Sequence, residues 1–259
     1  MRKFLIKILG ETNYIKLETL KKRWWPTTYD KEQSKFLDEQ VKFYGQFIKQ
    51  GDLCFDVGGN VGLKTNVFLK LKARVVTLEP QQNCVTILKA KYGNKATILQ
   101  KGAGAQNVVQ EFYVSNDSPL SSFAKDWVNE MKDSRFHGSS IERVDQIELV
   151  TLDSLITTYG KPGFIKIDVE GYEIEVLKGL SKSFGSLSFE YAVPEKRNEI
   201  TACLQEMGRK FTGLVCNYAV CNESQLALKE WLPLNIMESL VLEDDFNATF
   251  AGDIYIKQL

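Results

Sequence analysis

The chain has 259 residues, of which 44% are apolar and 25% are charged, the balance of an ordinary globular protein. Its 33 basic and 33 acidic residues give a formal net charge of zero. That balance argues against a nucleic-acid-binding surface, which carries a strong basic excess. The length suits one α/β domain with insertions.

The cysteines and the N-terminus favour a cytoplasmic protein. Five cysteines without a C-x-x-C pair argue against a zinc site or a redox pair, so we expect reduced, buried thiols. The apolar run of the first ten residues is interrupted by Lys7 and ends at Gly10, with no signal-peptide cleavage site after it. No stretch approaches the ~20 apolar residues of a membrane-spanning helix.

The first 50 residues are predicted to form an N-terminal helical segment, with the main domain over residues 51–259. Residues 1–33 are basic and are interpreted as a short helix and a connector. From Ser34 onwards, apolar side chains recur at the spacing of one helix face: Leu37, Val41, Tyr44 and Ile48.

Strand and helix patterns then alternate, which is typical of a parallel sheet with helices on both faces. The predicted elements are a strand at Leu53–Phe55, a helix with Leu63, Val67, Phe68 and Leu71 inward, a strand at Arg74–Leu78, a helix through Val85 and Leu88, and a strand at Thr97–Leu99.

The pattern lapses over residues 103–160, which we interpret as an insertion before the fourth strand of the sheet. Two strands are expected within it, at Glu111–Val114 and Ile147–Val150. The sheet resumes at Phe164–Asp168, and its later strands are predicted at Leu187–Tyr191, near Leu214–Val215 and at Ile254–Ile256.

A glycine loop, Asp56 to Gly62, follows the first strand directly. A dinucleotide-binding loop needs the pattern G-x-G-x-x-G. Gly58 provides its first glycine, but Asn60 and Leu63 occupy the other two positions. Since the second glycine admits a pyrophosphate, its absence disfavours NAD and favours a ligand without phosphates, such as S-adenosylmethionine. Asp56 would support the loop or the ligand's ammonium group.

An acidic residue, Glu79, ends the second strand 21 positions after Gly58. A carboxylate about 20 residues beyond the loop is expected to bind a ribose diol, although it can also be a simple helix cap. Together the two features indicate a cofactor that carries adenosine. The remaining candidate cofactor-binding residues are Gly59, Pro80, and Gly102 after the third strand.

A second candidate cluster follows the fourth strand. Asp168 falls at its carboxyl end, the edge at which open α/β sheets bind ligands. Alternation would point Asp168 and Glu170 the same way if the strand continued. Two carboxylates there could deprotonate a hydroxyl acceptor or hold a divalent cation. His137, the one histidine, is a further candidate base, with an exposed loop residue as the alternative.

Four motifs in order resemble the FkbM family of methyltransferases: Phe55–Gly62, Glu79-Pro80, Leu152–Leu155 and Ile165–Gly171. The resemblance covers about residues 50 to 192. It implies a class I methyltransferase fold with a seven-stranded, mostly parallel sheet, and methylation of a hydroxyl oxygen on a sugar, glycoconjugate or natural product. The family usually has Ala where this chain has Gly59.

Three other functions are less consistent with the residues. A nicotinamide-dependent oxidoreductase lacks support because the central glycine is missing. A non-catalytic partner subunit would not need the intact loop, Glu79 and the Asp168 cluster. A nucleic-acid methyltransferase is disfavoured by the neutral charge and by the absence of an Asn/Asp-Pro-Pro-Tyr loop.

Overall fold

The structure is a computed structural model that describes residues 6, 10–24, 27–116, 121–126, 140–221 and 225–258. Its helices are α2 (Glu11–Trp24), α3 (Thr28–Tyr44), α4 (Leu63–Lys70), α5 (Gln82–Tyr92), α7 (Leu152–Tyr159), α8 (Glu173–Lys178), α9 (Arg197–Lys210), α10 (Leu234–Val241) and the 3-10 helix η2 (Asp244–Thr249). Its strands are β1 (Leu53–Val57), β2 (Arg74–Leu78), β3 (Ala96–Leu99), β4 (Gly102–Ala103), β5 (Val109–Ser115), β6 (Ile141–Val150), β7 (Phe164–Ile167), β8 (Ser186–Ala192), β9 (Leu214–Val220), β10 (Leu232–Pro233) and β11 (Ala251–Gln258).

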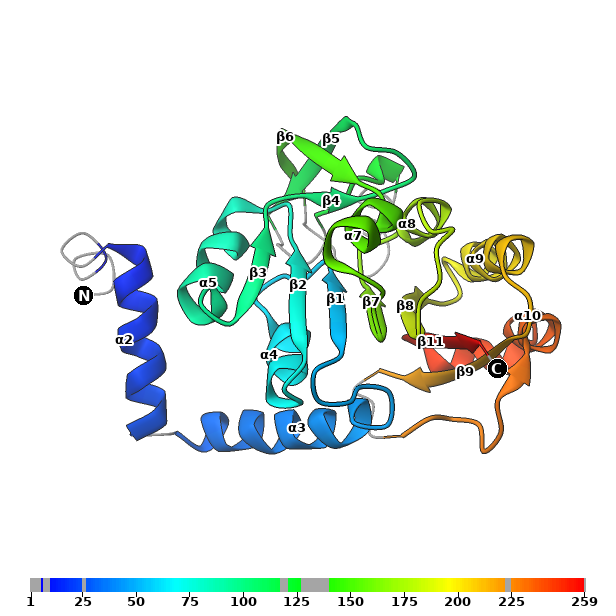
Figure 1. The fold of residues 1–259 in the computed structure, drawn as a ribbon, viewed down its shortest axis with the longest axis horizontal. Coiled ribbons are helices and arrows are strands. Elements are labelled where there is room, and N and C mark those ends of the chain that lie inside the picture. Colours follow the sequence, from blue (N-terminus) through cyan, green and yellow to red (C-terminus); the bar gives the residue numbers. More distant parts are fainter. Residues whose placement is uncertain are drawn as a thin grey trace.

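The main sheet has the strand order β10-β9-β11-β8-β7-β1-β2-β3 (Figure 1). The five strands from β8 to β3 are parallel, and β11 runs antiparallel between β8 and β9. The predicted α/β fold is confirmed, but the count of seven strands is wrong. The eighth strand is β10, only two residues long and antiparallel to β9, too short to produce an alternating pattern.

Two hydrophobic clusters hold helices on the two faces of the sheet. One joins the odd-numbered residues of β1, such as Phe55, to the inner faces of α7, α8, α9 and α10. The other joins Cys54 and Phe164 to Phe43 and Tyr44 of α3 and to Phe68 of α4. Since α3 contributes to this second cluster, its end is part of the packed core, and the division of the chain at residue 50 stays a prediction.

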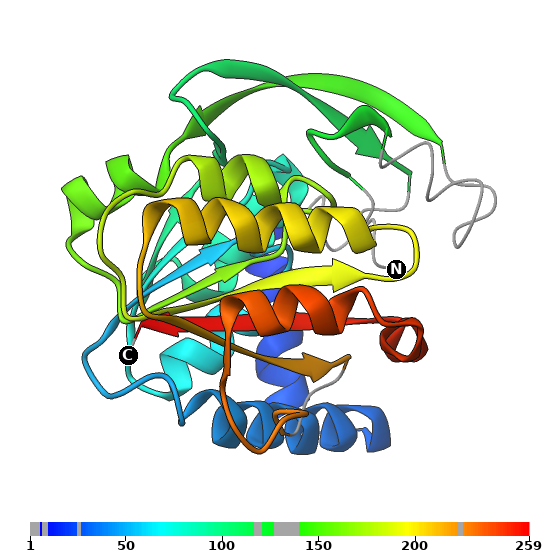
Figure 2. The same ribbon diagram turned by 90° about the vertical axis from the view of Figure 1, so that its right-hand side faces the viewer.

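The predicted insertion is a separate three-stranded sheet of order β4-β6-β5. The two expected strands are β5 and β6, which the structure pairs antiparallel, and β4 pairs with β6 in parallel. In Figure 2 the long strands of this sheet, drawn in green, arch over the main sheet. The insertion therefore stands above the edge at which the parallel strands of the main sheet end.

The helix predicted to begin at Ser34 begins at Thr28 instead. A capping box explains the difference: Thr27 Oγ1 accepts a hydrogen bond from the Asp30 amide, and Asp30 Oδ2 accepts one from the Thr27 amide, at 3.2 and 2.9 Å. Such reciprocal bonds satisfy the first N–H groups of a helix. Leu63, predicted to face inward, is 43% exposed at the start of α4.

None of the described helices combines the length and the apolar character that crossing a lipid bilayer requires. The helices are instead amphipathic or short, and each of the six described helices from α3 to α9 has buried side chains.

Candidate cofactor and acceptor site

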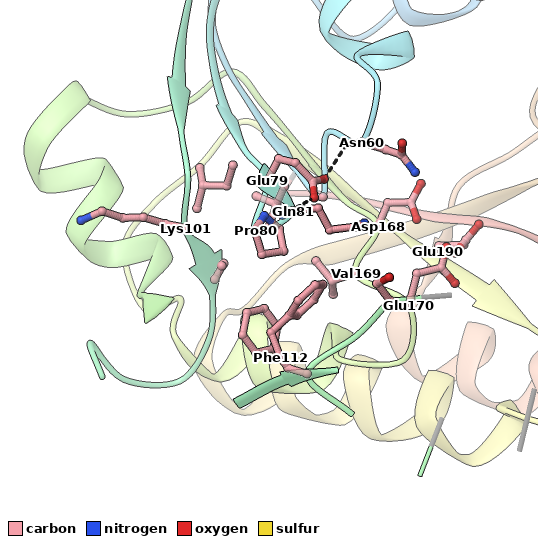
Figure 3. A pocket seen from close by; sticks show the side chains of 17 residues that line it. Asn60, Glu79, Pro80, Gln81, Lys101, Phe112, Asp168, Val169, Glu170 and Glu190 are labelled. Carbon is pink, nitrogen blue, oxygen red and sulfur yellow. Dashed lines mark hydrogen bonds between the residues drawn. The ribbon is translucent and has the colours of Figure 1, made fainter. Parts of the chain in front are cut away.

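A pocket with about 670 Å³ of empty space opens where β1, β2, β7 and β8 end (Figure 3). This is the edge at which open α/β sheets bind ligands. Its lining residues are Val57, Gly58, Asn60, Leu78, Glu79, Pro80, Gln81, Lys101, Gly102, Ala103, Phe112, Ser121, Phe123, Asp168, Val169, Glu170 and Glu190.

Gly58 carries the chain from β1 into the loop with a φ of +87°. Its amide donates a hydrogen bond to the Leu78 carbonyl oxygen at 3.0 Å. A Cβ atom at this position would lie 1.7 Å from the backbone oxygen of Asp168. Only glycine therefore allows the β1 loop and the β7 loop to approach each other beside the pocket.

Glu79 connects the end of β2 to the glycine loop. Only 3% of this residue is exposed, and its carboxylate accepts hydrogen bonds from the amides of Asn60 at 2.7 Å and Gln81 at 2.8 Å (dashed in Figure 3). Burial raises the pKa of Glu79 to about 7, against the lowering effect of those two bonds. Gln81 precedes α5, so Glu79 both lines the pocket and supports a helix start.

Asp56 lies behind the loop and does not line the pocket. It is 2% exposed and accepts a hydrogen bond from Thr65, whose hydroxyl is 2.8 Å from that of Thr77. Burial raises the pKa of Asp56 to about 6. Of the two roles considered for Asp56, support of the loop agrees with this position. Gly59 and Gly62 are also absent from the lining.

Gly59→Ala is expected to destabilise the protein, because a Cβ atom there would lie 2.1 Å from Thr77 Cγ2. Overpacking of this kind costs about 1–3 kcal/mol. Thr77→Ser removes that methyl group but keeps the hydroxyl that reaches Thr65. The double variant should therefore recover most of the loss in thermal unfolding. Strictly additive effects of the two substitutions would contradict this explanation.

Three half-buried carboxylates, those of Asp168, Glu170 and Glu190, gather at one end of the pocket (Figure 3). One oxygen from each lies within 4.8 Å of the others, so the group could hold a metal ion. The sequence argument from strand alternation is wrong, because β7 ends at Ile167 and Glu170 has a φ of +55°. The turn brings Glu170 to the pocket instead. The predicted divalent cation stays a prediction.

Asp168 is held from below by a buried ammonium group. Lys166 Nζ lies 3.4 Å from Asp168 Oδ2 and 2.7 Å from Asp253 Oδ1. Asp168 does not cap the next helix, since α8 begins after Tyr172 and no side chain caps it.

The insertion contributes an apolar wall to the pocket, which the sequence analysis did not predict. Phe112 and Phe123 pack with ring centroids 4.7 Å apart, and both line the pocket together with Ser121. A Cβ atom on Gly102 would lie 2.5 Å from the Phe123 ring, so Gly102 lets this wall approach. His137 lies outside the described residues.

Glu190 and Lys101 are two charged lining residues that the sequence analysis missed. Glu190 sits near the end of β8, and its position near the end of the predicted strand Leu187–Tyr191 was the available signal. Lys101 lies at the opposite end of the pocket from the carboxylates (Figure 3) and pairs with Glu148 at 2.6 Å.

A comparison with protein-family models matches residues 56–225 to the methyltransferase FkbM domain, which is well over half of the chain. The chain belongs to the FkbM methyltransferase family. This is a family of S-adenosylmethionine-dependent methyltransferases, and the resemblance noted from the motifs of this chain is confirmed.

A curated relative of this FkbM methyltransferase is the hexuronic acid methyltransferase AglP of Haloferax volcanii. The two are 27% identical over 143 residues, 54% of this chain and 55% of AglP. The chain thus matches about half the length of that relative.

Solved structures with similarity to the chain include a TehB-like methyltransferase from Corynebacterium glutamicum, with 7% identity, a TM-score of 0.45, and coverage of 85% of this chain and 88% of that one. Another is the plantazolicin methyltransferase BpumL in complex with a triazolic desmethylPZN analogue and SAH, with 11% identity, a TM-score of 0.42, and coverage of 97% of this chain and 100% of that one.

Proposed function

We propose that this enzyme transfers the methyl group of S-adenosylmethionine to a hydroxyl oxygen of a sugar, glycoconjugate or similar small molecule. The observation that supports this acceptor class is the group of three carboxylates, Asp168, Glu170 and Glu190, within 4.8 Å of one another at the pocket's end. Carboxylates accept hydrogen bonds from hydroxyl groups and repel anions. A neutral polyol is therefore the kind of acceptor that the carboxylate end of the pocket would bind.

The residues present fit S-adenosylmethionine along the length of the pocket. Glu79 is placed to accept hydrogen bonds from the ribose hydroxyls, and Leu78, Pro80 and Phe112 offer apolar surface for adenine. The acidic end suits the positively charged sulfonium and ammonium groups. When bound, the cofactor supplies an electrophilic methyl group.

The chain's own residues would act by positioning and by proton removal. A hydroxyl is a weak nucleophile, so its proton must leave as the oxygen attacks. Holding the oxygen in line with the methyl group reduces the entropic part of the barrier. Asp168, fixed by Lys166, is the residue of this end that is best placed to align the hydroxyl.

A second candidate is methyl-ester formation on the carboxylate of a hexuronic acid, because the relative AglP is named a hexuronic acid methyltransferase. The acidic end of the pocket disfavours it, since an anionic acceptor would enter among three carboxylates. Under both candidate functions the acceptor would be a small molecule or a glycan, and not a nucleic acid.

The test is an acceptor screen with S-adenosylmethionine carrying a radioactive methyl group. Neutral oligosaccharides and matched uronic acid oligosaccharides would be incubated with the enzyme, and the products treated with dilute alkali. Label that resists alkali is a methyl ether and supports the proposal. Label released by alkali is a methyl ester and supports the second candidate, and transfer to neither class would contradict both.

A further inference from the structure

Polar side chains form two adjacent rows across strands β7, β8 and β11, on one face of the sheet. In the first row, Lys166 of β7 pairs in register with Ser188 of β8. Two residues further along, Glu190 of β8 pairs with Asp253 of β11, and Asp168 lies beside Glu190. Because side chains alternate along strands, a lysine lies directly beneath a row of three carboxylates.

The lysine is shared unequally among these carboxylates. Its Nζ atom lies 2.7 Å from Asp253 and 3.4 Å from Asp168. Among the ion pairs of the described residues, none involves Glu190 within 4.0 Å. Within the part of the chain that the structure describes, Asp168 is therefore in an ion pair with Lys166, and Glu190 is in none.

This difference in ion pairing bears on the proton affinity of Glu190. Burial, followed by the negative charges of Asp168 and Glu170, raises the pKa of Glu190 well above its usual range, and Lys166 counteracts this only in part. A general base works best when its pKa is close to the working pH. Two carboxylates in unequal environments commonly take different catalytic roles.

We propose that Glu190 is the catalytic base that receives the acceptor's proton, while Asp168, paired with Lys166, aligns the hydroxyl. This inference rests on the proposed transfer to a hydroxyl oxygen. As the carbon–oxygen bond forms and the carbon–sulfur bond breaks, the O–H proton moves to a Glu190 oxygen. The positive charge of the sulfonium disappears as the sulfur becomes a neutral thioether, Glu190 becomes a neutral acid, and it later releases its proton to water.

Charged groups face Glu190 from each neighbouring element. Those on the sheet and the following turn are Lys166, Asp168, Glu170 and Asp253. Those lining the small cavity on its other side, toward α8 and α9, are Glu173, Lys196 and Glu199.

Kinetics of two variants distinguish the roles. Glu190→Gln should lower kcat by about 100-fold or more, the usual effect of losing a general base, and should abolish the acidic limb of the pH–rate profile. Asp168→Asn should raise the acceptor KM as well as lower kcat, and should keep the acidic limb. That limb should move to lower pH, because removing the Asp168 charge lowers the pKa of Glu190.

Carbon-13 NMR of protein labelled at the glutamate carboxyl carbons measures the same property without any acceptor. The signal lost in Glu190→Gln identifies Glu190, and it should titrate well above the usual ~4.3 of glutamate and shift downward in Asp168→Asn. Glu206→Gln is the matched control, since Glu206 is a largely buried carboxylate of α9 that pairs with Lys210. It should change neither the profile nor the Glu190 signal.

Several results would overturn the assignment of Glu190: a kcat within threefold of the wild type in Glu190→Gln, an acidic limb that survives in that variant, or a Glu190 signal with an ordinary pKa. Failure of the proposed function is separable from these. In that case no hydroxylated acceptor is methylated, yet the NMR titration still reports whether the pKa of Glu190 lies well above its usual range.

Discussion

Gly58→Ala should reduce stability and cofactor binding more than any other glycine-to-alanine substitution in the glycine loop. The added Cβ atom would lie 1.7 Å from the Asp168 backbone oxygen, and the residue keeps a φ of +87°. A positive φ costs a non-glycine residue about 1–3 kcal/mol, and the overlap adds a similar amount. We expect a loss of about 3 kcal/mol or more in the free energy of unfolding and at least about tenfold weaker binding of S-adenosylhomocysteine.

Gly51→Ala is the matched control for this variant. Gly51 has a φ of +88°, but nothing lies within 4 Å of the position of its Cβ. It should lose only about 1 kcal/mol from backbone strain and should bind S-adenosylhomocysteine normally. Chemical denaturation and calorimetric titration measure both effects. Equal losses in the two variants would show that the approach to Asp168 is unimportant.

Glu79→Gln should weaken binding of S-adenosylhomocysteine by about 10- to 100-fold, because hydrogen bonds to a charged group contribute roughly 1.5–3 kcal/mol. The wild-type affinity should also increase as the pH rises from 6 to 8. The pKa of Glu79 is about 7, and the ionised form is the better acceptor for two ribose hydroxyls. The variant should lose this pH dependence.

Glu79 also accepts hydrogen bonds from the amides of Asn60 and Gln81. A control must therefore separate ribose binding from support of the backbone. Asp56→Asn makes the same chemical change in the same loop, behind the pocket, and should lower stability more than affinity. A dideoxyribose analogue of S-adenosylhomocysteine gives a second arm. The wild type should discriminate against the analogue, and Glu79→Gln should not. Equal discrimination by both proteins would exclude Glu79 as the ribose partner.

The cofactor half of the site could be predicted because its signals are local in sequence. The strand-to-loop transition at Gly58 and the acidic end of the second strand at Glu79 follow from one βαβ unit, in which consecutive strands lie side by side. Both residues line the pocket. β1 and β2 pair in parallel, so the residues that follow them, Gly58 and Glu79, lie at the same edge of the sheet.

Residue patterns did not reveal which residues of the glycine loop face the pocket. Asp56, Gly59 and Gly62 share the loop with Gly58, but they face Thr65, Thr77 and Tyr92 and not the pocket. A sequence motif records which residues occur together, whereas the side that each faces depends on backbone angles and on packing partners distant in sequence.

Tertiary structure decided which residues gather at the end of the pocket that holds Asp168, Glu170 and Glu190. Glu190 meets Asp168 because β8 pairs with β7, and Asp253 shares Lys166 because the C-terminal strand β11 inserts beside β8. No local period encodes such contacts, since they join segments separated by up to 87 residues. The sequence by itself determined the fold class, the cofactor and the place of the glycine loop after the first strand. Only long-range strand pairing decided which carboxylates meet, because side-chain chemistry at a sheet edge is set by neighbours in space.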